Sequence, residues 1–463
     1  MVLGSVKKEE VGAVLGILVL AAVWFSPPLG GMDERIQRNV ALTLFAVIWW
    51  AFGVIHPGYT SLILMLGYVL SGVAPVETVF SYWVNPIIYL VIGSFLLAEA
   101  VRKSGLGKRV ALKVVAPLAK GYRSLVVLGY FGGLPLSLLI PHPFPRAFLL
   151  MAVLAPILEA ARLPRKERAS VGLAVFAGSS ANSFFFLTAD SSLNPLVVGM
   201  VNLHMSWMQW AEHMFVPTLG LTALMCLTHL LLFRSKGEFR VAEEAVQVAL
   251  RGIGPFSQME KRALFWMGLA VLLWLTDTYH GIHTAWITLG CALGMSLPRV
   301  GELLKEEDFS RLPLGTFFFL TGAISIGVVG TATGMNQWLA GWVLPDEIPE
   351  NLFLLAALLV AITMMVHFFL GSAIAVLSVL VPVMGDFALA HGISPLFCAL
   401  IVLTTVKIQW VFSFHLVDVL VGLGDQQGKY TERESRRLGL SMAVTVFVVV
   451  LGVEVPWWML SGL

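Results

Sequence analysis

Long apolar stretches recur along the whole of this sequence, and they constrain its fold more than any other feature. Several run for roughly 18 residues or more, which is enough for a helix to cross about 30 Å of hydrocarbon. Charged residues make up only 13% of the 463 positions and apolar residues 58%. Soluble proteins average about a quarter charged. The sequence therefore predicts an all-α polytopic membrane protein.

Eleven of these stretches are predicted to be transmembrane helices. The first follows two lysines, Lys7 and Lys8, and has no small-residue cleavage site after it, so we expect a retained helix and not a signal peptide. The predicted spans are residues 11–27, 39–55, 58–76, 85–103, 168–187, 208–233, 263–277, 282–298, 313–330, 394–424 and 438–461.

Two further apolar regions, 122–161 and 350–391, are long enough to enter the membrane and return, and each is broken near its middle. Three prolines between Pro141 and Pro145 make the first break, because they remove backbone donors. The pair Gly371-Ser372 makes the second. Broken backbone at membrane depth is tolerated only against protein or a water-filled cavity. We therefore predict two re-entrant hairpins.

Lysine and arginine are unevenly distributed over the predicted loops. With the N-terminus in the cytoplasm, every cytoplasmic loop is basic, whereas from Thr331 to Val406 there is no lysine or arginine. This asymmetry predicts a multi-pass protein of the cell's inner (plasma) membrane with a cytoplasmic N-terminus. Amphipathic segments at 104–121 and 334–345 are predicted to lie in the membrane interface.

The two halves of the sequence resemble each other at a nearly constant offset. The run Gly93–Ala111 matches Gly322–Ala340, 229 positions later, and Asp190 matches Asp418 at 228. An odd number of crossings per repeat would invert one repeat relative to the other, and secondary transporters of this architecture bind substrate near the midplane between the repeats. We predict one membrane domain, 1–463, with repeat 1 over 39–233, a cytoplasmic linker over 234–262 and repeat 2 over 263–462.

The runs Gly93–Ala111 and Leu314–Ala323, with the order of spans and hairpins over almost the whole chain, resemble the divalent anion:sodium symporter family of the ion-transporter superfamily. The resemblance implies a homodimeric elevator-type carrier, whose transport domain moves a dicarboxylate, sulfate or similar anion past a fixed scaffold. That family carries Ser-Asn-Thr at each hairpin tip. Counting back from Pro156 and Pro382 leaves only Ser372 matching, so the usual two sodium sites are not expected.

Arg146 is the most informative single residue. A guanidinium at membrane depth costs on the order of 2.5–3.5 kcal/mol, so it needs a partner or a wet cavity. It would lie at the start of the hairpin's second helix, where free amides and the helix dipole also favour an anion, and its charge could replace a bound sodium. Alternatively, it snorkels to the interface or forms a structural pair. His142 in the same loop could carry a coupling proton or donate to the anion, or it is simply packed.

A run of small polar residues follows inside the next apolar segment. Such a run suits an unwound helix whose hydroxyls and amides line a pocket, although close helix packing through small residues is the alternative. Together with the hairpin residues, the run completes the predicted substrate-binding set: Arg146, His142, Ser179, Ser180, Asn182, Ser183, Thr188 and Ser372.

Four ionisable residues in the predicted spans are candidates for coupling or for ion pairs: Asp190, Asp418, Lys407 and His415. Close to one another or to Arg146 they would titrate as a coupled set, and structural salt bridges are an equal expectation. The sequence contains no known catalytic motif and no metal-binding motif. The two aspartates could mimic an intramembrane aspartyl dyad, although no other feature supports one.

The leading hypothesis is a secondary active transporter of a small anion, not an enzyme, without the usual two sodium sites. Its expected partners are the anion, the lipid bilayer and a second copy of the chain in a homodimer, with no nucleic acid. No cofactor is expected, and Na⁺ and H⁺ are left open as coupling ions. Two alternatives stay open: a carrier of a neutral or lipid-linked substrate, in which Arg146 is structural, and an intramembrane enzyme using the paired aspartates.

Overall fold

The computed structural model describes residues 7–28, 30–235, 250–344, 349, 351–425 and 427–463. All the regular elements within these residues are helices, and the chain divides into two compact units. Both predicted repeats contribute to each unit. Unit 1 comprises Met1–Ile88, Leu196–His204 and Pro313–Val406, and unit 2 comprises Tyr89–Pro195, Met205–Leu312 and Lys407–Leu463.

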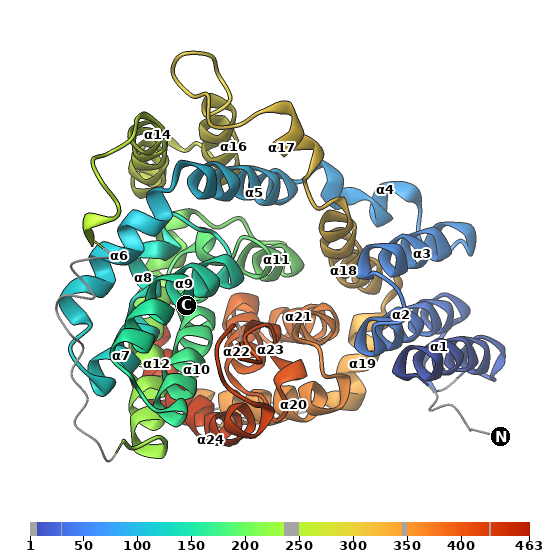
Figure 1. Cartoon of the computed structure of the whole chain (residues 1–463). Helices are drawn as coiled ribbons and strands as arrows, with labels where there is room; N and C mark the ends of the chain where they lie inside the picture. The colour runs from blue at the N-terminus through green and yellow to red at the C-terminus, as the bar shows by residue number, and fades with distance from the viewer. Residues whose placement is uncertain (1–6, 29, 236–249, 345–348, 350, 426) are drawn as a thin grey trace, which may run out of the picture. The chain divides into compact units, whose positions relative to one another are not determined.

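Unit 1 is built around four long helices. Helices α1 (Lys8–Phe25), α2 (Glu34–Phe52) and α3 (Pro57–Leu70) pack side by side, and α3 also packs against α18 (Leu314–Thr333) (Figure 1). A Cβ added to Gly58 would lie 2.5 Å from the carbonyl oxygen of Gly315, so these two backbones meet where neither residue has a side chain. The short helices α4 (Val76–Val79) and η1 (Ser81–Val84) follow α3.

The second predicted hairpin lies wholly in unit 1. Helices α20 (Leu352–Leu370) and α21 (Ala373–Ala390) are separated only by Gly371 and Ser372, the break predicted from the sequence. Gly371 has a φ of 61°, a left-handed conformation that glycine adopts without steric cost. Ser372 caps α21, because its Oγ accepts a hydrogen bond from the amide of Ala375 at 3.4 Å.

Two helix pairs show the same construction at matched positions. Helix α5 (Pro86–Ser104) is joined to α6 (Leu106–Leu118) through Gly105, and α18 is joined to α19 (Met335–Val343) through Gly334. Both glycines are left-handed, with φ of 80° and 84°. The second helix of each pair occupies the segment for which an interfacial helix is predicted. The inverted relation between the repeats stays a prediction.

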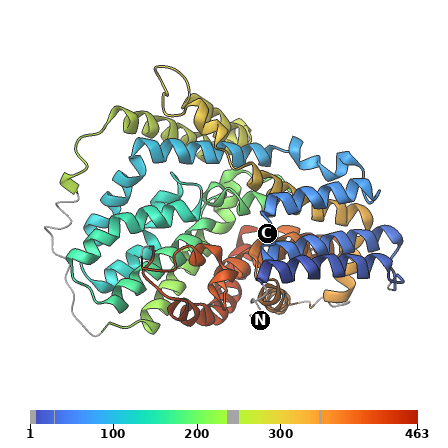
Figure 2. The same cartoon turned by 45° about the vertical axis from the view of Figure 1, so that its right-hand side comes forward.

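Unit 2 contains the first predicted hairpin. Helices α7 (Tyr122–Phe131), α10 (Arg165–Ala181) and α12 (Trp207–Leu232) pack against one another (Figures 1 and 2). The hairpin continues from α7 through α8 (Gly133–Ser137) to α9 (Pro143–Ala160). The break therefore comes earlier than predicted. Pro143 and Pro145 lie in the first turn of α9, where proline is tolerated because the first amides of a helix have no intrahelical partner.

The remaining helices of unit 2 surround this core, and α11 continues from unit 2 into unit 1. They are η2 (Asn182–Phe184), η3 (Leu187–Asp190), α11 (Leu193–Met200), α14 (Gln258–Leu275), α15 (Asp277–His280), α16 (Thr284–Gly294), α17 (Glu306–Ser310), α24 (Glu432–Val449), η5 (Val450–Glu454) and α25 (Val455–Ser461).

The span predicted over 394–424 is wrong as a single helix. Helix α22 (Pro395–Ile408) ends in its middle, and only η4 (Ser413–His415) and α23 (Val417–Leu420) follow. Tertiary hydrogen bonds replace the helical ones here. The indole of Trp410 donates to the backbone oxygen of Ser435 at 3.2 Å, and the Ser413 hydroxyl bonds the Ser435 hydroxyl at 2.6 Å.

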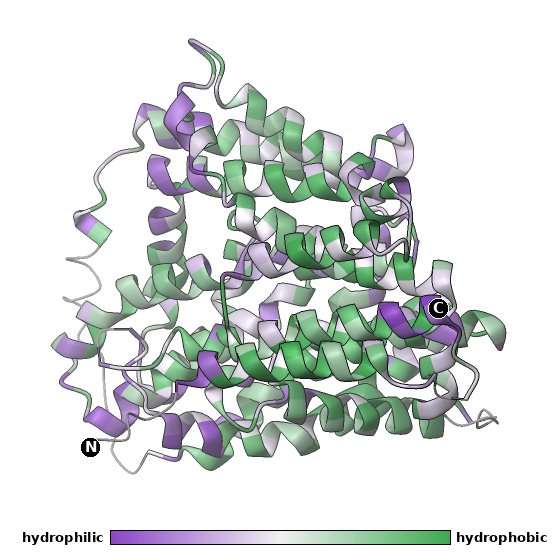
Figure 3. Cartoon of the chain, turned by 90° about the vertical axis from the view of Figure 1, so that its right-hand side faces the viewer, coloured by the Kyte–Doolittle hydropathy of each residue, from purple (hydrophilic) through white to green (hydrophobic). Residues whose placement is uncertain are grey.

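The apolar character predicted from the sequence lies along the helices. Figure 3 shows mostly hydrophobic residues along the helices and hydrophilic ones concentrated at their ends and connections. The other ten predicted spans overlap α1, α2, α3, α5, α10, α12, α14, α16, α18 and α24. Six helices of the described residues are long and apolar enough to cross a membrane: Pro143–Ala160, Trp207–Leu232, Leu314–Thr333, Leu352–Leu370, Ala373–Ala390 and Glu432–Ser461.

The predicted fold class, an all-α polytopic membrane protein, is confirmed. The number of crossings, the re-entrant course of the hairpins and the orientation stay predictions. Residues 236–249 of the predicted linker lie outside the described residues, as do 345 and 350 at the ends of two predicted segments.

Candidate functional site

The tip of the first hairpin offers fewer amides to an anion than the sequence suggests. His142 caps α9, and its Nδ1 accepts a hydrogen bond from the amide of Phe144 at 3.3 Å. Pro143 and Pro145 have no N–H. Of the first three residues of α9, two therefore have no amide N–H and the remaining one has its amide bonded to the His142 ring. Positive charge at this tip comes from a side chain, that of Arg146.

Arg146 lies one turn into α9 with only 1% of its surface exposed. Its Nη1 donates to the carbonyls of Ile140, at 3.0 Å, and Ala189, and its Nη2 donates to the carbonyl of Ser179 at 3.1 Å. The Nε has no hydrogen-bond partner among the described residues. One guanidinium thus joins the hairpin tip, the end of α10 and η3, through neutral oxygens.

Two serines near the end of α10 also bond to backbone carbonyls. The Ser179 hydroxyl donates to the carbonyl of Pro143 at 2.7 Å, and the Ser180 hydroxyl donates to the carbonyl of Lys407 at 3.1 Å. Both carbonyls belong to segments where helical hydrogen bonding begins or ends. A helix end leaves its last carbonyls without intrahelical partners, so the bond from Ser180 satisfies the buried carbonyl of Lys407 near the end of α22, and the bond from Ser179 ties α10 to the start of α9.

The other polar residues of this run are held in the same way. Asn182 donates from Nδ2 to the carbonyl of Tyr130 at 2.8 Å, and Ser183 donates to a carbonyl one turn earlier. The Thr188 hydroxyl accepts from the indole of Trp207 at 3.0 Å. The Oδ1 of Asn182 has no partner within the described part of the chain. A substrate-binding role for these residues stays a prediction.

The strongest electrostatic feature is a buried ion-pair cluster of three residues. The ammonium of Lys407 lies 2.6 Å from Oδ2 of Asp418 and 3.1 Å from Oδ2 of Asp190. The three residues are 3%, 5% and 2% exposed in that order. Asp190 also uses its Oδ1, which accepts from the amides of Ser192 and Leu193 at 3.2 Å each and so caps α11.

These three charges come from the ends of helices and not from their middles. Lys407 stands in the last turn of α22, where the helix dipole favours a positive charge. Asp190 is the last residue of η3, and Asp418 stands in the first turn of α23. Both aspartates therefore lie where the chain leaves regular helix. They are also the two residues that match, 228 positions apart, between the predicted repeats.

His415 and Ser372 have local partners. The Nδ1 of His415 accepts from the amide of Phe412 at 3.1 Å, and its ring stacks on Phe414 with centroids 4.4 Å apart. Ser372, in unit 1, caps α21 as described above.

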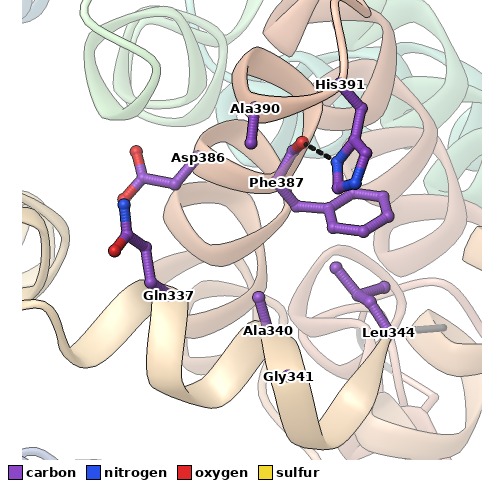
Figure 4. A pocket seen from close by; sticks show the side chains of 8 residues that line it. All are labelled: Gln337, Ala340, Gly341, Leu344, Asp386, Phe387, Ala390 and His391. Atoms are coloured by element: carbon purple, nitrogen blue, oxygen red, sulfur yellow. Dashed lines mark hydrogen bonds between the residues drawn. The ribbon is translucent and has the colours of Figure 1, made fainter. Parts of the chain in front are cut away.

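Unit 1 has a hollow of its own, between α19 and the end of α21. It has a volume of about 230 Å³ and is lined by Gln337, Ala340, Gly341, Leu344, Asp386, Phe387, Ala390 and His391 (Figure 4). Asp386 accepts from Thr331 and Asn336, each at 3.0 Å, and Nδ1 of His391 bonds the carbonyl of Phe387. A carboxylate in a largely apolar lining does not suit a small anion.

A series of hydrogen-bonded polar side chains in unit 2 was not predicted from the sequence. His229, fully buried on α12, bonds the hydroxyl of Tyr130 at 3.1 Å and that of Ser170 at 2.8 Å. Ser170 in turn bonds the hydroxyl of Tyr122 at 2.8 Å. A histidine within an apolar helix is itself a signal of function or of a specific partner, and that signal could have identified it. Its partners lie 59 and 99 residues away, so no local pattern reveals them.

Helices of membrane-spanning length, helices broken at depth and a buried charge cluster together define a class, the polytopic secondary transporters. The sequence matches the family described as "Sodium:sulfate symporter transmembrane region" over residues 7–463. The chain belongs to this family of anion transporters, and the family predicted from the sequence is confirmed.

Named relatives and a solved structure agree with this assignment. An "L-tartrate/succinate antiporter" of Escherichia coli strain UTI89 is 25% identical over 79% of this chain and 76% of its own length. The "Dicarboxylate transporter 1, chloroplastic" of Spinacia oleracea is 24% identical over 96% of this chain and 80% of its own length. The crystal structure of the Alcanivorax borkumensis YdaH transporter, described as having an unusual topology, shares the fold. Its TM-score is 0.53 at 17% identity, covering 98% of this chain and 97% of that one.

Proposed function

We propose that this chain is a secondary carrier of a small dianion of the dicarboxylate or sulfate class, and that it operates without the usual two sodium sites. Family membership supports the anion, and two relatives named as dicarboxylate or tartrate/succinate transporters make C4 dicarboxylates the first class to test. The homodimer and the elevator movement implied by the family resemblance are part of this proposal.

The observation that carries the proposal is the set of four charged side chains buried in unit 2: Lys407, Asp190, Asp418 and Arg146. A charge inside an apolar helical protein is expensive to bury, so a group of four at helix breaks indicates a functional site more than simple packing. Two cations and two carboxylates sum to zero, so the unloaded site carries no net charge.

Arg146 retains one donor that suits a carboxylate. Three of its five N–H groups bond to carbonyls, but the Nε–H has no partner in the described chain. Nε and Nη2 form the side-on edge of a guanidinium, which binds carboxylates in a bidentate manner. That edge is buried here, so an anion reaches it only when the hairpin tip separates from η3.

The alternative of an intramembrane aspartyl enzyme has less support. A catalytic pair of carboxylates shares a proton because two like charges cannot both ionise at close range. In this protein Asp190 and Asp418 both contact the Lys407 ammonium instead. The family and its named relatives are transporters.

Thermal denaturation of the purified full-length protein tests the function directly. Sulfate, phosphate, succinate, tartrate and citrate are each added in sodium and in choline buffer of equal ionic strength. We expect one anion class to raise the melting temperature equally in both salts, because a bound ligand stabilises the folded state. Arg102→Gln is the control, since this cation is 67% exposed and outside the cluster, and it should keep the response.

Two results would contradict the proposal. No response to any anion would reject the anion as substrate, and a response only in sodium would reject the sodium-free mode. Exchange of labelled succinate in proteoliposomes, with and without internal succinate, then distinguishes exchange from net uptake.

A further inference from the structure

We propose that the ammonium of Lys407 is a tethered replacement for a free monovalent cation, in a site whose ligands are the carboxylates of Asp190 and Asp418. This inference adds a charge-balancing mechanism to the proposed function. It rests on the proposed function only for the measurement of anion exchange in proteoliposomes. The site is built like one for a small cation, because two carboxylate oxygens converge on a single point at 2.6 Å and 3.1 Å.

The carboxylate of Asp190 is positioned by the protein as well as by the lysine. Oδ1 of Asp190 is fixed by the amides of Ser192 and Leu193, and this capping directs Oδ2 toward the ammonium. The backbone at Lys407 is fixed as well, because its carbonyl accepts from Ser180. Asp190 would therefore largely keep its place without the lysine side chain, and Asp418 lies close enough to share a cation bound there.

The charge count makes the ammonium necessary. Arg146 lies beside η3, bonded to the carbonyl of Ala189 next to Asp190, but its described partners are neutral oxygens. It supplies a positive charge without contacting a carboxylate. Loss of the Lys407 charge leaves two buried carboxylates against one guanidinium, an excess of one negative charge that a cation from solution can neutralise.

A tethered cation has a consequence for coupling. A cation gradient can drive transport only if the cation dissociates on the other side of the membrane, because a ligand shifts an equilibrium only through its binding. The ammonium of Lys407 never leaves the protein. A cation gradient therefore cannot drive accumulation of the anion through this site, which agrees with the antiport named for the tartrate/succinate relative.

The test removes the tether and asks whether a free cation takes its place. Lys407→Ala is purified as the full chain, and its melting temperature is measured in sodium, potassium, lithium and choline chloride at equal ionic strength without any anion substrate. We expect a loss of roughly 5–10 °C in choline relative to wild type, partly recovered by millimolar sodium or lithium. Wild type should show no such cation preference.

The double variant Lys407→Ala with Asp418→Asn is the matched control. It removes one positive and one negative charge, so the remaining Asp190 and Arg146 balance. We expect it to be more stable than Lys407→Ala in choline and to show no response to sodium. In proteoliposomes, anion exchange by Lys407→Ala should become at least about tenfold faster with sodium, a change of about 1.4 kcal/mol, while wild-type exchange is unchanged.

Each outcome decides the proposal. Recovery of the melting temperature of Lys407→Ala by sodium or lithium, and not by choline, supports it. Two results for the variants overturn it: Lys407→Ala is equally unstable in every salt, or neither variant is folded in any salt. Sodium-specific stabilisation of wild type also overturns it. These measurements need no anion, so they stand whether or not the anion panel identifies a substrate.

Discussion

Arg146 and Lys407 are both cations buried in unit 2, yet their partners differ in kind. Arg146 donates to three backbone carbonyls from three segments of the chain, and Lys407 contacts two carboxylates. The first set of contacts depends on the planar fork of donors that only a guanidinium has. The second depends on charge, because a compact ammonium needs no particular orientation between two anions.

From the sequence, both the structural and the charge-balancing role are assigned to Arg146. The structure divides these roles between Arg146 and Lys407. Arg146 holds the broken hairpin tip together, which is a geometric task, and its Nε–H has no partner among the described residues. Lys407 neutralises two carboxylates at the helix breaks, which is an electrostatic task. A substitution that alters the shape of the side chain should therefore destabilise the protein at Arg146. A substitution that alters the charge should destabilise it at Lys407.

The largest effect is expected from removing one carboxylate of the cluster. Asp418→Ala leaves the Lys407 ammonium with a single partner and should destabilise the fold by roughly 3–5 kcal/mol. Asp190→Ala should cost about 1 kcal/mol more, because the cap of α11 is lost as well. Thermal denaturation in detergent measures both. Equal loss in the two variants would show that the cap contributes nothing, and effects as small as that of Arg102→Gln would contradict a buried ion pair.

A charge-preserving change at Arg146 should be nearly as damaging. Arg146→Lys keeps the positive charge but loses at least two of the three hydrogen bonds to carbonyls, so we expect a loss of roughly 3 kcal/mol. The Lys407→Ala with Asp418→Asn variant, which changes charges in pairs, should lose less. The two melting temperatures are compared in the same detergent. If Arg146→Lys were the more stable variant, charge and not shape would govern the hairpin tip.

A third cation, Arg109, extends the comparison to a buried ion pair at the start of α14. It pairs with Glu260 at 2.7 Å, and both side chains are 7% exposed. Hydrogen bonds from Arg109 hold the pKa of Glu260 below its ordinary value of 4.5. A depressed pKa adds stability above the unfolded pKa, and this stability is lost as pH falls through the folded value.

Glu260→Gln should therefore lower the melting temperature by a few degrees at pH 7 and by less near pH 4. Melting curves between these two pH values measure the difference. A deficit that stays the same across this range would show that the carboxylate charge of Glu260 does not contribute.

The smallest effect is expected at the tip of the second hairpin, where no charge is involved. Ser372→Ala removes the cap of α21, a bond of 3.4 Å, and should cost about 0.5–1 kcal/mol. Ser372→Asn retains an oxygen acceptor at the cap and should stay close to wild type. A loss as large as that of Arg146→Lys would mean that the two hairpin tips are supported in the same way.

The positions of the helix breaks show how far sequence reasoning reaches. The break at Gly371-Ser372 could be predicted, because glycine at such a point reflects a local backbone requirement. The end of α22 at Ile408 could not, because the residues that follow leave the helix for partners such as Ser435, 25 residues away from Trp410. The sequence alone does not distinguish the two prolines in the first turn of α9 from a helix break, because proline suits both places.

The candidate site was likewise predictable from the sequence only in part. Asp190, Asp418, Lys407 and Arg146 could each be identified as unusual, since a charge in an apolar segment is noticeable in any sequence. Which cation would contact the carboxylates could not be identified, because Lys407 is 217 residues from Asp190 in the chain. Likewise the pocket-lining role of the serines near the end of α10 stays a prediction, and the sequence could not show that their hydroxyls donate to carbonyls of Pro143 and Lys407.

The sequence by itself determined the class of protein, the family and the order of helices, because these depend on composition, apolar length and local turn chemistry that short segments express alone. Tertiary structure decided which buried charges meet, where α22 stops and which donors of Arg146 are committed. Those outcomes depend on the pairing of groups far apart in the chain. A buried charge or carbonyl takes whichever partner the fold brings within about 3 Å.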